Sequence, residues 1–377
     1  MPPVSLRILS WREWPKHAAA WGDLLDCSPY ASFFLSPAWV GTWISTFAAD
    51  LATRLLLFEA GGCLVATCLL TRRLRWIHGI PLRCAYFNCA GEDRSESTCI
   101  EYNALIAVPE FEQEVAGLLA QHIRRSGCDL LFLNGIVVNQ AALGRLGSAI
   151  GLPETVEVVS HYVDLARLRR DNVDLLESLS SNTRRQIRRA MRLYERKYGG
   201  PCLLRTANTM DEALACFTQL VELHQQNWRI RNRPGAFSAP RSQAFHRHLI
   251  RTAFPAGEVQ LHRLQAGDEI LGVLYNFRYQ GKIYFYQSGF QYHSDNRLKP
   301  GLLTHAAAME YYLRQPDIVE YDFLAGDSRY KRSLTTDSRH LHWVKVWAFT
   351  PLSTVFRWLR SVKRNLTAVI QRVPAAK

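Results

Sequence analysis

The chain has 377 residues, 48% of them hydrophobic and 21% charged, which suits two globular domains with buried cores. Its formal net charge of +13 indicates polyanionic partners such as nucleic acid, an acidic membrane surface, or phosphorylated cofactors and substrates. Nine cysteines without a CxxC pattern argue against a disulfide framework and favour a reducing compartment. Without a signal-peptide core or 18 uninterrupted apolar residues, a cytoplasmic protein lacking membrane spans is expected.

The first part of the chain predicts a mixed α/β domain without a recognisable catalytic cluster. Ser36 and Pro37 fit the cap and first residue of one of its helices. We expect a strand at 4–9, a helix at 13–27, a helix from 36, a hairpin at 54–70, irregular chain at 73–106, a helix at 111–126, a strand at 129–133 and a helix at 141–149. Pro153 marks the expected boundary, which gives domains of residues 1–152 and 153–351.

The second domain is expected to begin with a strand at 155–165, a helix at 173–179 and a strongly basic helix at 182–199. The basic side chains of that last helix are Arg184, Arg185, Arg188, Arg189, Arg192, Arg196 and Lys197. Two interpretations stay open, a solvated surface helix and a basic face that contacts phosphates.

Helices at 211–229 and 241–253 flank a loop in which arginines mix with Trp228 and Phe237. Such a loop suits recognition of an anionic or sugar-like ligand. It is equally typical of a surface loop that these two rings anchor to the core.

Residues 282–334 organise the second domain. Strands at 259–264 and 269–279 precede a strand at 282–290, a basic loop, a helix from Pro300 and a strand at 318–323. The free amides and dipole of a helix start favour an anion, and Arg297 and Lys299 would add charge-assisted contacts. Pro300 lacks an amide, and neither a P-loop nor GxGxxG is present, so an ordinary strand-to-helix turn is the alternative.

A strand at 342–349 closes the domain, and residues 352–377 form a basic amphipathic helical tail. Its apolar side chains, Val355, Phe356, Leu359, Val362, Leu366, Val369 and Ile370, lie near one face. Such a helix can rest on an anionic membrane surface or pack on its own domain.

Six separated motifs in the second half occur in an order that resembles the GNAT acyltransferases. They are residues 181–189, Trp228 with 234–237, 272–277, 286–290, 298–301, and 321–327 with Tyr330 and Lys331. The nearest match is the CelD/BcsL-like family, which is related to the FemAB peptidoglycan aminoacyltransferases. Residues 34–39 resemble the family more loosely. The resemblance implies an α/β fold of two tandem GNAT-like domains, each a mostly antiparallel sheet flanked by helices.

The resemblance also implies a site. The loop and helix start that bind the cofactor pyrophosphate in GNAT enzymes match Arg297, Leu298, Lys299, Gly301 and Leu302, although Lys299-Pro300-Gly301 replaces the usual Q/RxxGxG/A. Tyr330 matches a tyrosine that protonates the leaving thiolate, and Lys331 a lysine that stabilises negative charge. Asp322, at a strand end, is the expected base, with loop capping or pairing to an arginine as its alternative. The expected substrate-binding residues are Trp228, Phe237, Tyr286, Gln287, Ser288 and His305, the last equally typical of a packed core; no metal is expected.

The expected function is acyl transfer from acyl-CoA, acetyl-CoA foremost, or from an acyl-carrier protein, to an amine or hydroxyl of a sugar or cell-envelope precursor. One alternative is a FemAB-like transferase that uses aminoacyl-tRNA, which the net charge and the helix at 182–197 would suit. Against it, no long charged helix pair interrupts the second half. A second alternative is a non-catalytic polyanion- or membrane-binding protein on a GNAT scaffold. We expect a cytoplasmic protein, and its helical tail could hold it at the inner face of the membrane.

Overall fold

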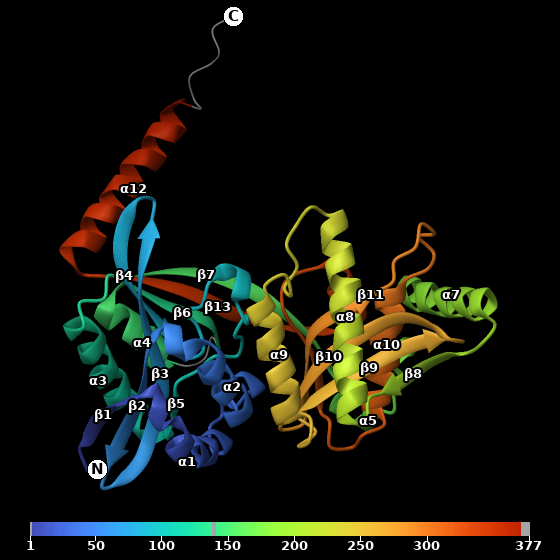
Figure 1. The fold of residues 1–377 in the computed structure, drawn as a ribbon, viewed down its shortest axis with the longest axis horizontal. Helices are drawn as coiled ribbons and strands as arrows, with labels where there is room; N and C mark the ends of the chain where they lie inside the picture. The colour runs from blue at the N-terminus through green and yellow to red at the C-terminus, as the bar shows by residue number, and fades with distance from the viewer. Residues whose placement is uncertain (1, 138–140, 371–377) are drawn as a thin grey trace, which may run out of the picture.

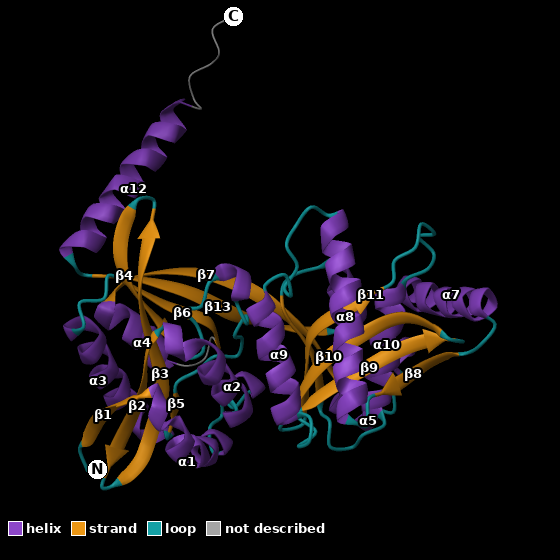
Figure 2. Ribbon diagram, viewed as in Figure 1, coloured by secondary structure: helices purple, strands orange, loops and turns teal. Residues whose placement is uncertain are grey.

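The computed structural model describes residues 2–137 and 141–370, and the side chains of its last helix as far as residue 361. Figure 1 shows two sheet-and-helix halves joined by long strands, and Figure 2 shows the same view by secondary structure. The described strands form one sheet in the order β1-β2-β3-β4-β6-β13-β7-β12-β11-β10-β9-β8, with β5 paired to β3.

The described residues of the first half form six strands before the junction and four α-helices. These elements are β1 (Val4–Ser10), α1 (Trp14–Asp26), α2 (Pro37–Phe47), β2 (Ala52–Ala60), β3 (Cys63–Ile77), β4 (Ile80–Phe87), β5 (Ile106–Ala107), α3 (Glu112–Arg125), β6 (Leu130–Val137), α4 (Ala141–Ile150) and the junction strand β7 (Gly151–Asp164).

The second half continues without a linker. Its elements are α5 (Leu165–Arg170), α6 (Leu175–Ser178), α7 (Ser181–Tyr198), β8 (Cys202–Thr206), α8 (Met210–Ile230), α9 (Pro240–Ala253), β9 (Val259–Ala266), β10 (Glu269–Tyr279), β11 (Lys282–Phe290), α10 (Pro300–Leu313), β12 (Glu320–Ala325), α11 (Arg329–Leu334), β13 (Asp337–Ala348) and α12 (Pro351–Ile370).

The two halves repeat one order of elements. Each has an antiparallel hairpin that leads into a third strand, then a helix, a strand parallel to the third, a short helix and a long strand. In the first half α3 connects the parallel strands β4 and β6, and in the second half α10 connects β11 and β12. The two halves exchange their last strands. β7, the last strand of the first half, pairs with β12 of the second half, and β13, the last strand of the second half, pairs with β6 of the first half. The predicted boundary at residues 152 and 153 falls within β7.

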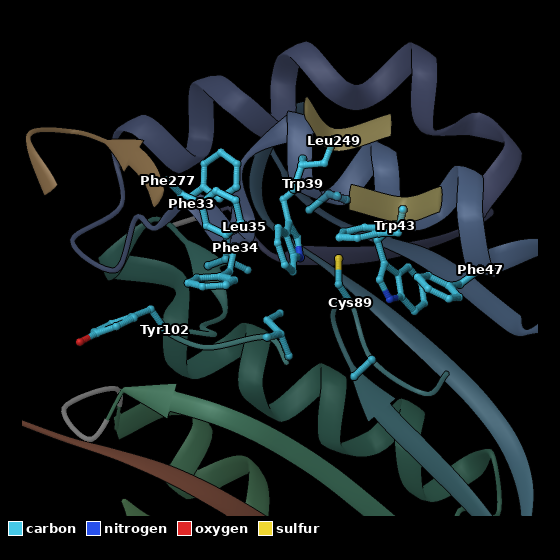
Figure 3. Packing of buried hydrophobic residues seen from close by; sticks show 14 of the residues in the cluster. Phe33, Phe34, Leu35, Trp39, Trp43, Phe47, Cys89, Tyr102, Leu249 and Phe277 are labelled. Atoms are coloured by element: carbon cyan, nitrogen blue, oxygen red, sulfur yellow. The ribbon is translucent and has the colours of Figure 1, made fainter. Parts of the chain in front are cut away.

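Successive side chains of a strand point to opposite faces of the sheet, so the core forms two layers. On one face of the sheet, α1, α2, α8 and α9 cover a single hydrophobic cluster that runs through both halves. On the other face, α3 and α4 cover one cluster, and α5, α7 and α10 cover another. In the continuous layer the ring of Phe33 stacks on that of Phe277 with centroids 4.2 Å apart, and Trp39 contacts both (Figure 3). The halves therefore share a core.

Most elements lie where the sequence predicts them, but irregular chain over 73–106 is wrong. β3 continues to Ile77 and turns at His78 and Gly79, both with positive φ, into β4. Residues 74–83 form strand pairs only with each other among the described residues, because the pairing of β3 with β2 ends at Arg72 and the pairing of β4 with β6 begins at Cys84. We call residues 71–84 the arm. Because the arm extends beyond its neighbours, its apolar side chains Leu74 and Trp76 are exposed rather than buried.

Other differences concern short elements and the ends of strands. β8 and α11 are absent from the sequence expectation, β12 begins at Glu320, and β13 begins already at Asp337. The helical tail is present as α12 over Pro351–Ile370, whereas residues 371–377 of the predicted tail lie outside the described residues.

Candidate functional site

The parallel strands β11 and β12 separate after a short paired stretch. Residues 282–284 pair with 320–322, and beyond them β12 bends away through a bulge. Leu324 adopts a left-handed conformation at φ 59°, and Gly326 follows at φ 118°. Parting the strands ends their ladder in the middle of the sheet, so the backbone beyond Tyr284 and Asp322 no longer pairs between these two strands.

A cavity of about 400 Å³ lies at the end of β11. We call it the strand-end cavity. Its walls come from α8, the end of β11, the loop that follows, the first turn of α10 and the start of α11. Of the residues predicted from the sequence, it collects Trp228, Gln287, Ser288, Leu298, Lys299, Gly301, Leu302 and Tyr330.

The start of α10 faces this cavity without a side-chain cap. Lys299 occupies the cap position, Pro300 is the first helical residue, and the amides of Gly301 and Leu302 belong to the first turn, which has no intrahelical acceptors. Lys299 lines the cavity, so a cation lies beside these donors. The helix dipole adds positive potential at the same end. This corner can bind a phosphate.

α8 forms the facing wall and is fixed to β11 by direct contacts. The His224 ring accepts a hydrogen bond from the Ala236 amide at Nε2 (3.2 Å), so Nδ1 donates to the Ser288 carbonyl (3.0 Å). Burial lowers the pKa of His224, which agrees with this neutral tautomer. At Gly289 an added Cβ would lie 2.6 Å from the carbonyl oxygen of Leu220, so glycine permits the close approach of α8.

Besides Asp322 and Lys331, which are described below, four predicted site residues lie outside the lining of this cavity. Phe237 is fully buried against Phe217 and His224, and Tyr286 donates its hydroxyl to the Thr98 carbonyl (2.9 Å) within the shared core. Arg297 is ion-paired with Asp295 at 2.8 Å on the surface. The fourth residue, His305, is described next.

His305 is buried directly behind the cavity wall. Its ring stacks on Tyr330 with centroids 5.7 Å apart, and Nδ1 lies 3.1 Å from the Tyr321 hydroxyl. Burial, with a smaller contribution from the Lys331 charge, lowers the pKa of His305 to about 3. It is therefore neutral at physiological pH and supports Tyr330 by packing.

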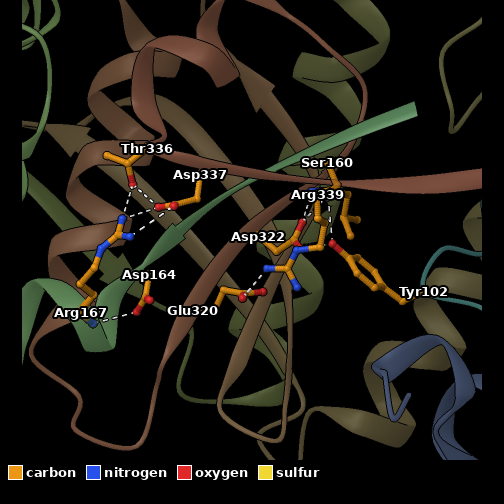
Figure 4. A network of polar contacts seen from close by, with 10 residues as sticks. Tyr102, Ser160, Asp164, Arg167, Glu320, Asp322, Thr336, Asp337 and Arg339 are labelled. Carbon is orange, nitrogen blue, oxygen red and sulfur yellow. Dashed lines mark hydrogen bonds and ion pairs between the residues drawn. The ribbon is translucent and has the colours of Figure 1, made fainter. Parts of the chain in front are cut away.

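Asp322 points into the junction between the halves (Figure 4). It is fully buried, accepts hydrogen bonds from the Tyr102 hydroxyl, the Ser160 hydroxyl (2.9 Å) and the Leu324 amide (2.6 Å), and lies 4.0 Å from Arg339. Burial and the Asp322 charge raise the pKa of Tyr102 well above its usual value, so that hydroxyl remains a donor. The carboxylate does not line the strand-end cavity, and it fixes the bulge of β12 to the first half.

Lys331 is buried at the same bulge. Its ammonium donates to the carbonyls of Leu324 and Ala325, both at 2.9 Å. The Ala325 amide in turn donates to the Glu101 carboxylate of the first half at 2.7 Å. Burial raises the pKa of Glu101 to about 7 and lowers the pKa of Lys331, while the opposite charge of each partly offsets the shift of the other.

A larger cavity of about 780 Å³, which we call the junction cavity, lies between the halves. Glu101, Ala325 and Gly326 form one part of its wall. Aromatic and basic side chains form much of the rest: Trp76, Tyr86, Phe132, Trp343, Arg75, Arg94 and Lys345. The bulge of β12 thus belongs to the junction cavity, while Tyr330, next to Lys331 in the chain, lines the strand-end cavity.

Sequence reasoning missed Glu101, Tyr102 and the junction cavity. Glu101 lies in irregular chain and accepts a hydrogen bond from the amide of Ala325, 224 positions away in the sequence. No local sequence pattern distinguishes it. The one feature of the sequence that could have indicated the junction is the repeated order of elements. Two such repeats are expected to meet along their last strands.

The comparisons with known proteins agree with this geometry. Residues 181–332 match the family model described as an acetyltransferase (GNAT) domain. FemX has a similar structure at 11% identity, with 90% of this chain and 98% of FemX covered and a TM-score of 0.60. A conserved protein of unknown function from Bacteroides thetaiotaomicron is similar at 11% identity, 92% and 100% coverage, and a TM-score of 0.53.

The C-terminal domain of a protein named as a lysylphosphatidylglycerol synthetase, from Agrobacterium fabrum, is similar at 8% identity, 91% and 95% coverage, and a TM-score of 0.53. No protein of curated function matches by sequence. Because these three structures are only 8–11% identical to this chain, the similarity shows the fold alone. The predicted fold class is confirmed: residues 181–332 match the GNAT acetyltransferase domain model, and the chain has a fold similar to that of FemX. The narrower CelD/BcsL-like resemblance stays a prediction.

Two further findings concern the described residues alone. None of the helices there combines the length and apolar character that a membrane crossing requires. The same part of the chain has no cluster of three or more His, Cys, Asp or Glu side chains arranged to hold a metal ion.

Proposed function

We propose that this protein is an acyltransferase that moves an acyl group from a carrier in the strand-end cavity to an amine or hydroxyl in the junction cavity. The single observation that carries the proposal is the bulge of β12. There Lys331, beside the strand-end cavity, and Glu101, in the wall of the junction cavity, bond to the backbone of one residue, Ala325. Acetyl-CoA is the donor that we propose first.

The donor side is supported by the start of α10. Free amides at Gly301 and Leu302, with Lys299 beside them, suit the pyrophosphate of coenzyme A. Beyond Tyr284, where β11 loses its pairing with β12, a thioester arm has a route along the end of β11 toward Gln287 and Ser288. Arg297, paired with Asp295 outside the cavity, is left out of this donor site.

The acceptor side is supported by Glu101. With a pKa of about 7, this carboxylate can accept a proton from an attacking amine or hydroxyl near neutral pH. Asp322, the base expected from the sequence, is engaged by Tyr102, Ser160 and a backbone amide. We therefore assign proton abstraction to Glu101 and positioning of the bulge to Asp322.

The transfer step balances with these groups. The acceptor N or O bonds to the acyl carbon and loses its proton to Glu101, the carbon–sulfur bond breaks, and the leaving thiolate takes a proton from Tyr330. Burial raises the pKa of Tyr330, so the hydroxyl is protonated beforehand. The Lys331 ammonium, fixed at the bulge, supplies positive charge near the oxyanion.

The lining of the junction cavity supports a sugar or cell-envelope precursor as acceptor. Aromatic faces such as Trp343 can stack on a sugar ring, and Arg75 and Lys345 can pair with a phosphate. The free cysteines of the described chain suit a cytoplasmic location, which we include in the proposal.

One observation favours an aminoacyl-tRNA donor as the second candidate. Arg189, Arg192 and Arg196 of α7 are exposed, and no carboxylate of the described residues forms an ion pair with them. At the end of the same helix, Lys197 Nζ lies 3.4 Å from His293, which lines the strand-end cavity. A basic helix beside the cavity suits a polyanionic carrier.

The test is release of free thiol from acetyl-CoA in the presence of a panel of amino sugars and sugar phosphates. The wild-type protein should release thiol with at least one acceptor, and Glu101→Gln should slow the release by about 10²–10⁴-fold. Asp93→Asn, an exposed carboxylate, is the matched control. Absence of release with acetyl-CoA, together with transfer from aminoacyl-tRNA, would replace the first donor by the second; absence of both would contradict the proposal.

A further inference from the structure

α12 begins at the end of the molecule where the arm projects (Figure 1). Its first turns expose apolar side chains. Trp358 is 64% exposed, and Val355 and Leu359 are also exposed. These positions follow a spacing of three and four residues, so they form one stripe on the helix. Phe356, on the inner side, is buried. The helix therefore has a packed face and an unpartnered apolar face.

The arm exposes a second apolar group. Trp76 is 70% exposed near the tip, and Leu74 is exposed two residues before it. Side chains two residues apart on a strand lie on the same face, so both rise from one side of the arm. Buried apolar partners for these groups are absent in the described chain, although both belong to a well-paired hairpin.

The arm and α12 form one structural unit. The ring of Phe356 stacks on Trp347 of β13 at 5.1 Å and on His78 of the arm's turn at 6.3 Å. Arg360 of α12 also binds Glu154 of β7 at 3.0 Å. The two exposed apolar groups are therefore held at the same end of the molecule.

The charges of this unit have one sign. The arm contains Arg72, Arg73, Arg75 and Arg83 and lacks Asp and Glu. Arg73 and Arg83 are ion-paired with Asp93 and Asp129, whereas Arg72 and Arg75 form no ion pair with the described residues. Residues 349–377 likewise lack Asp and Glu and contain Arg357, Arg360, Lys363, Arg364, Arg372 and Lys377. A second copy of the same surface would bring like charges together. Exposed tryptophans amid arginines instead match the interface of an anionic bilayer, where the rings enter the headgroup layer.

We propose that the arm and α12 together form a docking surface for an anionic lipid bilayer, with Trp76 and Trp358 as the inserted side chains. The junction cavity opens beside this surface, because Arg75, Trp76 and Ile77 line it. Docking would place that opening at the headgroup level, which suits an acceptor carried on a lipid. This last point rests on the proposed function, whereas the docking itself does not.

The experiment is co-sedimentation of the full chain with vesicles of phosphatidylcholine alone or mixed with phosphatidylglycerol. The wild-type protein should sediment with the mixed vesicles and stay in solution with phosphatidylcholine. Trp358→Glu and Trp76→Glu should each abolish sedimentation, and Arg357→Gln should weaken it about fivefold. Added salt should weaken binding further, because it screens the lipid charge.

Leu203→Glu is the matched control, since Leu203 is an exposed apolar residue on β8, at the far end of the sheet from the arm. It should sediment like the wild type. Failure of the wild-type protein to sediment with the mixed vesicles would overturn the proposal, as would equal loss in all three glutamate variants. A dimer in light scattering that Trp358→Glu dissociates would overturn it in favour of a second copy. Thiol release in solution is read separately, so the proposed function stands or falls independently.

Discussion

Glu101 and Lys331 bond to the same residue: Glu101 accepts the Ala325 amide at 2.7 Å and Lys331 donates to the Ala325 carbonyl at 2.9 Å. One residue comes from each half of the chain, and both lie at the bulge where β12 leaves β11, with Lys331 buried and Glu101 partly buried. Burial penalises both charges, and their attraction offsets part of that penalty. A change at either residue should therefore alter the bulge and the titration of the other.

The raised pKa of Glu101 predicts a pH dependence of activity. A base must be deprotonated, so kcat/KM for thiol release should rise as the pH passes through about 7. Glu101→Gln should remove this rise. A profile in Glu101→Gln with the same midpoint as the wild type would assign the titration to another group.

The same pKa predicts an opposite trend in stability. The folded protein retains the Glu101 proton between pH 4.5 and about 7, where an unfolded chain has lost it. Its contribution to the free energy of unfolding should therefore fall as the pH rises through this window. Urea titrations of wild type and Glu101→Gln at several pH values measure the difference, which should grow in favour of the variant toward pH 7.

Lys331→Met should lower both turnover and stability. The change keeps an unbranched side chain but leaves the carbonyls of Leu324 and Ala325 without their donor, at a cost of about 1–3 kcal/mol. Loss of positive charge near the oxyanion should reduce kcat by about 10²-fold or more with a smaller change in KM. Steady-state kinetics and urea denaturation separate the two effects. Unchanged kcat in a folded variant would remove Lys331 from the mechanism.

Asp322→Asn distinguishes a positioning residue from a base. Asparagine keeps one acceptor oxygen for three donors, so we expect a loss of about 1–3 kcal/mol in the free energy of unfolding. The pH midpoint of kcat/KM should stay near that of the wild type. Intact stability with loss of the alkaline plateau would instead restore Asp322 as the base predicted from the sequence.

The shared core predicts that the two halves unfold together. Phe33 of the first half stacks on Phe277 of the second, and Trp39 packs against both (Figure 3). Phe277→Ala should cost about 3–5 kcal/mol. It should also shift the whole denaturation curve, followed by tryptophan fluorescence and by circular dichroism. Two separate transitions, of which only one moves, would show that the halves are independent.

The sequence predicted most of the second half because its signals are local. The strand at 282–290, the helix after Pro300 and the basic loop between them follow from periodicity and turn chemistry. They contain six of the eight predicted residues that line the strand-end cavity, whereas Trp228 and Tyr330 lie outside them. The same reasoning placed Phe237 and Tyr286 in the site, although both rings fill the core. Aromatic residues near a cavity and in a core have the same sequence signature.

The junction could not be predicted in this way. The pairing of β7 with β12 and of β13 with β6 joins segments that are far apart, and Glu101 meets the bulge only after this exchange has formed. The arm escaped detection because its apolar side chains face outward. Tertiary pairing, rather than local propensity, determines these parts of the molecule.

Calorimetric titration with acetyl-CoA tests the central claim, that the strand-end cavity binds an anionic acyl carrier. Lys299→Gln and Arg297→Gln each remove one positive charge from the same loop, but only Lys299 lines the cavity. We predict saturable binding by the wild type, about tenfold or greater weakening in Lys299→Gln, and little change in Arg297→Gln. Absence of binding, or equal weakening in both variants, would contradict the account.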